Sequence, residues 1–144
     1  MANYDPWGDL SRRTYLTVEF VDEPTGRRGR ICGNTILIDR HQLQAERRST
    51  VAHELVHDER RIFPADRVMR AREETLVERT AARRLIAVPD LIDALRACST
   101  RLADEIAEHL WVDVPMLEAR MSALDPLEVA ELEHQLEDQW LWIP

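Results

Sequence analysis

The residues best suited to chemistry are His53, Glu54 and His57, which form an H-E-x-x-H pattern. A helix places residues i and i+4 on one face about a turn apart, so both imidazoles can reach one metal ion. Imidazole suits zinc, whose catalytic sites use three protein ligands and keep one position open for water. Because zinc lowers the pKa of such a water to about 7, a carboxylate can take its proton. The pattern predicts a zinc site in which Glu54 is the general base for peptide-bond hydrolysis.

The alternative is that this short pattern arose by chance on a polar helix. The motif is flanked by the apolar residues Val51, Ala52, Leu55 and Val56, so it is expected to lie partly inward. An unpaired histidine buried there would cost free energy. This context favours the metal site over chance.

The third ligand must come from another helix, because the residues after His57 contain no extended metal-binding pattern. Glu78 shares a helical face with Ala81, Ala82 and Leu85, so its carboxylate is expected to point toward the core. Glu74 lies one turn earlier on the same stripe. Both could instead be solvated charges among neighbouring arginines, the usual state of glutamate on a charged helix. The pattern alone favours Glu78 by a small margin.

The elements that must position these residues indicate an α+β fold. Apolar and polar residues alternate over residues 15–21, and residues 35–38 are β-branched, so both segments are expected to be strands. The turn-forming residues between them favour an antiparallel pair. Beyond Asp39 the periodicity is helical. Helices are expected over residues 46–61, 72–87, 90–97 and 100–110, after Asp113 and Pro115, and after the cap at Asp125 and Pro126.

The 144 residues suit one domain with a single modest core. We expect an N-terminal arm over residues 1–14, the sheet and zinc-site helices over residues 15–97, and a C-terminal helical part over residues 98–144. The formal net charge of −8 disfavours direct nucleic-acid binding. Neither a signal peptide nor a membrane span is evident, so we expect a cytoplasmic protein that does not bind membranes. Cys32 and Cys98 are expected to be reduced.

Two blocks of the sequence resemble the ImmA/IrrE family of gluzincin-like zinc metallopeptidases, often encoded by phages, mobile elements and stress-responsive bacteria. The first is ERRSTVAHELVH, in which Val56 replaces a usual glycine, and it follows a strand ending in ILID. The second, ERTAARRLIAVP, is similar to a family segment whose leading glutamate is the third zinc ligand. Thr80 and Ala82 depart from the family's common Asn and Phe. The resemblance covers residues 36–124 and includes a helix-turn-helix-like pair.

This resemblance implies a zincin-like helical core and assigns His53, His57 and Glu78 as zinc ligands, with Glu54 as the catalytic base. It also implies cleavage of a regulatory protein, a phage-type or stress-response helix-turn-helix repressor. A zinc-containing regulatory module that acts by protein contact without hydrolysis is the alternative. Retention of Glu54 disfavours that alternative, because a binding module needs no general base.

Several residues have no assigned role. His109 and His134 have no partner at metal-ligand spacing, and His41 precedes the metal-site helix. The apolar tail over residues 140–143 suits either the core or a partner surface. The sequence identifies neither the residue that stabilises the oxyanion nor the oligomeric state.

Overall fold

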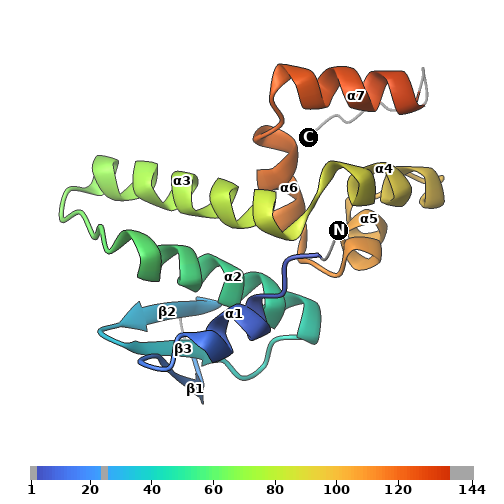
Figure 1. The fold of residues 1–144 in the computed structure, drawn as a ribbon. Coiled ribbons are helices and arrows are strands. Elements are labelled where there is room, and N and C mark those ends of the chain that lie inside the picture. Colours follow the sequence, from blue (N-terminus) through green and yellow to red (C-terminus); the bar gives the residue numbers. More distant parts are fainter. Residues whose placement is uncertain (1–2, 24–25, 137–144) are drawn as a thin grey trace.

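The computed structural model describes residues 3–23 and 26–136 and has an α+β architecture. A three-stranded sheet lies at one end of the molecule, with α2 against it and α3 beyond α2 (Figure 1). The strands are β1 (Thr17–Val21), β2 (Gly29–Cys32) and β3 (Thr35–Asp39). The helices are α1 (Pro6–Arg12), α2 (Gln44–Arg60), α3 (Arg67–Leu85), α4 (Val88–Ala97), α5 (Ala103–Leu110), α6 (Val114–Ser122) and α7 (Pro126–Leu136).

The sheet is mixed, so the expected antiparallel sheet was wrong. Its order is β1-β3-β2: β1 runs parallel to β3, and β2 runs antiparallel to β3. The short strand β2 forms the hairpin with β3 through a tight turn in which Gly33 has a positive φ of 58°. Because β2 takes the hairpin position beside β3, β1 must pair with the other edge of β3.

A short helix occupies the middle of the segment that we expected to be an N-terminal arm. Helix α1 begins after Asp5, whose side chain accepts a hydrogen bond from the Trp7 N–H, and Pro6 lies in its first turn. It packs against α2. Arg13, at its C-terminal cap, donates to the carbonyl of Leu55 and to Asp58 of α2.

The helices expected from periodicity are present, with shifted ends. Helix α3 begins at Arg67 because Asp66 caps it by accepting from the Met69 N–H. It ends at Leu85, and Pro89 lies in the first turn of α4. The expected helix after Asp125 is α7; residues 140–143 of the apolar tail lie outside the described part of the chain.

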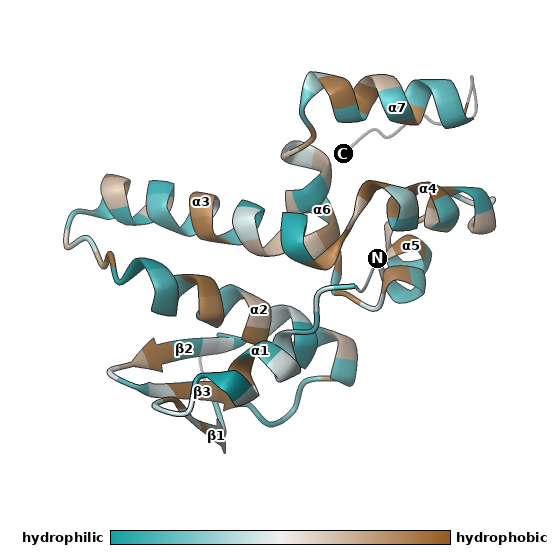
Figure 2. Ribbon diagram, viewed as in Figure 1, coloured by the Kyte–Doolittle hydropathy of each residue, from teal (hydrophilic) through white to brown (hydrophobic). Residues whose placement is uncertain are grey.

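Two hydrophobic clusters meet on adjacent faces of α2. Val51 and Leu55 pack with Ile36 and Ile38 of β3. Ala52 and Val56 join a larger cluster built from α3 to α7. Apolar and polar residues are correspondingly mixed along α2 and β3 (Figure 2). These two contacts fix the orientation of the helix that carries the H-E-x-x-H pattern.

Within residues 3–23 and 26–136, no helix combines the length and apolar character that crossing a membrane requires.

Candidate metal centre

The H-E-x-x-H residues lie in the middle of α2, on the part of its surface that neither hydrophobic cluster covers. His53 and His57 are one turn apart, with ring centroids separated by 4.9 Å. His57 is only 6% exposed and Glu54 only 4% exposed, so both carry polar groups into the protein. The spacing therefore places the two imidazoles together, as the sequence predicted.

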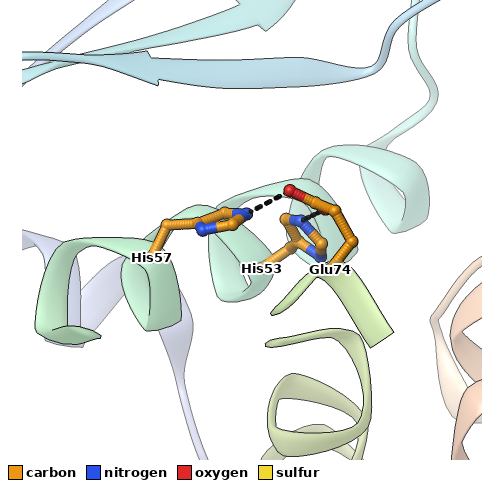
Figure 3. A group of neighbouring side chains, drawn as sticks. All are labelled: His53, His57 and Glu74. Carbon is orange, nitrogen blue, oxygen red and sulfur yellow. Dashed lines mark hydrogen bonds and ion pairs between the residues drawn. The ribbon is translucent and has the colours of Figure 1, made fainter. Parts of the chain in front are cut away.

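Glu74 of α3 faces both histidines (Figure 3). Its two carboxylate oxygens lie 3.1 Å from Nε2 of His53 and 3.0 Å from Nε2 of His57. The donor atoms of these three residues all lie within 4.8 Å of one another. For comparison, ligands at about 2.1 Å from a tetrahedral zinc are roughly 3.4 Å apart. Two imidazole nitrogens and one carboxylate at this separation are a donor set that fits zinc.

Glu78, the glutamate expected to be the third ligand, lies at the same site in a different position. Its carboxylate accepts a hydrogen bond from Nδ1 of His53, the ring nitrogen that does not face Glu74. A carboxylate at that nitrogen fixes the orientation and tautomer of a metal-binding imidazole. The structure thus brings Glu74 and Glu78 to the two sides of one histidine ring, and groups Glu74 with both Nε2 atoms.

The electrostatics of the cluster follow from this bonding. Burial lowers the pKa of His53, but hydrogen bonds to Glu74 and Glu78 outweigh it and raise that pKa to about 10. Hydrogen bonds from His53 and His57 hold the pKa of Glu74 well below its usual range. Burial raises the pKa of Glu54, and the nearby histidines oppose that shift only in part. The protonated imidazole of His53 therefore forms an ion pair with Glu74.

Nδ1 of His57 is buried and has no hydrogen-bond partner among the described residues. Such an orphaned nitrogen is uncommon in folded proteins. The His57 ring is covered on one side by Phe63, whose ring stacks on it at 5.9 Å between centroids. Phe63 itself is 57% exposed, so it forms an apolar rim of the site.

Gly29 of β2 allows the sheet to approach the metal-site helix. A Cβ atom at this position would lie 2.5 Å from Cγ2 of Thr50 and 2.9 Å from the carbonyl oxygen of Leu37. It would also lie 3.8 Å from Oε1 of Glu54. The absence of a side chain at Gly29 therefore lets β2 pass directly over α2 beside Glu54.

A cavity of about 550 Å³ opens over these residues. Its floor includes His53, Glu54, His57, Glu74 and Glu78. Its walls come from β2 and the residues before it, from the first turns of α3, and from the start of α6. This volume is within the usual range of ligand sites and admits a segment of peptide.

Sequence reasoning missed the contribution of Asp113 to this cavity. Asp113 caps α6 by accepting from the Met116 N–H, and its carboxylate pairs with Arg28 from the residues before β2. Burial raises the pKa of Asp113, although Met116 and Arg28 oppose the shift. The cap itself was expected from Asp113 and Pro115, but its pairing with Arg28, 85 positions away, has no local signal. The remaining histidines are not in the cluster: His41 pairs with Asp22 at the surface, 2.7 Å away, and neither His109 nor His134 lines the cavity.

Comparisons with protein-family models, curated proteins and solved structures find no match to this chain.

Proposed function

We propose that this protein is a zinc-dependent endopeptidase that hydrolyses a peptide bond in a regulatory protein. One observation carries the proposal: the Nε2 atoms of His53 and His57 converge on the carboxylate of Glu74, and the buried Glu54 lines the same cavity. Metal ligands alone would suit a structural site. A buried carboxylate next to the ligands, in an open cavity, is what a hydrolytic site needs in addition.

In this proposal His53, His57 and Glu74 hold the zinc ion, and Glu78 orients the ring of His53. When bound, zinc would act as a Lewis acid that polarises the scissile carbonyl and acidifies a water. Glu54 accepts the proton of the attacking water and delivers it to the leaving amine. The cavity between β2 and the first turns of α3 holds the peptide next to Glu54.

The substrate class is proposed from the resemblance described above. The ImmA/IrrE-like blocks favour a phage-type or stress-response transcriptional repressor with a helix-turn-helix domain. A cytoplasmic location, in which such a repressor is accessible, is part of the same proposal.

The test begins with elemental analysis of protein purified without added metal. We expect one zinc per chain, and loss of this zinc in His53→Ala. If the purified protein contained no divalent metal, and His53→Ala bound metal as well as the wild type does, the proposal would have no basis.

The second part of the test uses Glu54→Gln, which preserves side-chain shape but cannot take a proton. We expect this variant to keep its zinc and its fold while the rate of peptide cleavage falls at least about a hundredfold. The candidate substrate to assay is a helix-turn-helix repressor encoded beside the protein, and Glu118→Gln, exposed on α6, is the matched control. If Glu54→Gln supported the full biological response, the protein would act by contact without hydrolysis.

A further inference from the structure

The cavity above the metal centre has an unusual concentration of arginine for a chain with a net charge of −8. Arg27, Arg28 and Arg30 line it from β2 and the residues before it, and Arg70 lines it from α3. Acidic residues outnumber basic ones in the sequence, yet the cavity is lined by as many arginines as carboxylates, four of each.

The acidic residues of the same cavity are engaged with other groups. Glu74 and Glu78 face the imidazole of His53, and Glu54 is buried on α2. Asp113 pairs with Arg28. None of the cavity carboxylates therefore pairs with Arg27, Arg30 or Arg70, although Arg30 forms an ion pair with Glu23 outside the cavity lining.

Each of these three arginines has N–H groups that donate no hydrogen bond within the described part of the chain. Arg27 makes no hydrogen bond or ion pair there. Arg30 uses only Nε, which donates to Glu23 at 3.2 Å. Arg70 uses Nε and Nη2 to donate to the carbonyls of Pro64 and Ala65, which holds its guanidinium in place. Among the side-chain groups of a peptide, a carboxylate is the best match for an oriented guanidinium with free N–H groups.

We propose that the cavity selects a peptide segment that carries acidic side chains on both sides of the bond to be cleaved. Arg27 and Arg30 bind carboxylates on the side of β2, and Arg70 binds one on the side of α3. The cleavage step rests on the proposed function, whereas the selection of acidic peptides rests only on the arginines. Only the recognised segment has to be acidic, whatever the overall charge of the partner.

The test measures binding in a Glu54→Gln background, both with zinc added and without it, so that no peptide is consumed. The probes are three fluorescein-labelled ten-residue peptides in which alanine alternates with glutamate, glutamine or lysine. We expect the glutamate peptide to bind about tenfold more tightly than the glutamine peptide, as two or three partly exposed ion pairs would give. The lysine peptide should bind most weakly, and the preference should shrink with added salt.

A carboxylate can also bind zinc, so a variant that keeps the metal is the deciding measurement. In Arg27→Gln/Arg30→Gln the preference for glutamate over glutamine should fall to less than about threefold, while zinc content is unchanged. Arg27→Lys/Arg30→Lys should keep part of it because the charge remains. Arg12→Gln/Arg72→Gln is the matched control, since it removes the same charge from two exposed residues that do not line the cavity.

Three outcomes would overturn the proposal: equal binding of the glutamate and glutamine peptides, a preference that survives in Arg27→Gln/Arg30→Gln, or no binding of any peptide up to about 1 mM. Failure of the proposed function gives a different result. If the protein lacked zinc or hydrolytic activity but lost its glutamate preference only in the cavity double variant, the cavity would be an acidic-peptide binding site without catalysis.

Discussion

The position of Glu74 between the two histidines leads to a prediction about which glutamate holds the metal. Replacing Glu74 with alanine removes the carboxylate that is grouped with both Nε2 atoms. Replacing Glu78 with alanine removes an acceptor from Nδ1 of His53 and leaves both Nε2 atoms in place. The two variants therefore test different roles on opposite sides of the same ring.

The magnitudes follow from those roles. Zinc bound by four ligands in small proteins is held by about 10–16 kcal/mol, or about 3 kcal/mol for each ligand. Loss of a ligand in Glu74→Ala should weaken zinc binding by a similar amount, about 150-fold. Loss of an orienting carboxylate in Glu78→Ala should weaken it by about tenfold.

The assay is competition for zinc against a fluorescent chelator at neutral pH, with Glu118→Ala on the exposed face of α6 as the control. Circular dichroism of each variant shows whether the fold is kept. A larger loss in Glu78→Ala than in Glu74→Ala would refute this reasoning and assign Glu78 as the ligand, as the family resemblance implies. Equal and small losses would place the third ligand on another residue.

Two further predictions concern the scaffold. Gly29→Ala should lower the free energy of unfolding by about 1–3 kcal/mol, because the new methyl group would overlap Thr50, and urea denaturation would check this; an unchanged midpoint would mean that β2 can move away from α2 at no cost. Asp58→Asn should cost about 3 kcal/mol at pH 7, because Asp58 is buried and accepts hydrogen bonds from Tyr15, Arg13 and Arg61. These bonds hold the pKa of Asp58 below its usual value although burial raises it, so its contribution is present above about pH 4 and is lost as the pH falls through the folded-state pKa. The stability difference between wild type and Asp58→Asn should therefore shrink in acid, and a difference that stayed constant to pH 2 would contradict this explanation.

Local patterns in the sequence predicted most of the helices, because each has an apolar stripe and a recognisable start or end. The missed helix α1 carries the same signal, Asp5 followed by Pro6, that correctly located α7 at Asp125 and Pro126. Seven residues give too little periodicity to predict this helix. Strand β2 was missed for a similar reason, since it is four residues long and includes Arg30.

Pairings between distant segments could not be predicted in the same way. Alternation over residues 15–21 indicates a strand but says nothing about its direction relative to β3, which depends on where β2 inserts. Likewise, Glu74 and Glu78 differ by one helical turn and occupy nearly the same face of α3. Which of them contacts both histidines depends on the position of α3 along the axis of α2. The turn over residues 61–66 determines that position.

The two hydrophobic clusters that meet on α2 affect how the protein unfolds. Because Val51 and Leu55 belong to one cluster and Ala52 and Val56 to the other, neither can open without uncovering a flank of the same helix. Sheet and helical bundle are thereby coupled into one cooperative unit of unfolding. His53 and His57 lie on the shared helix, so partial unfolding of either half removes the geometry of the candidate metal centre. Under the proposed function, a molecule that has begun to unfold at either end would lose the arrangement needed for hydrolysis, so damaged copies would be inactive rather than unspecific proteases.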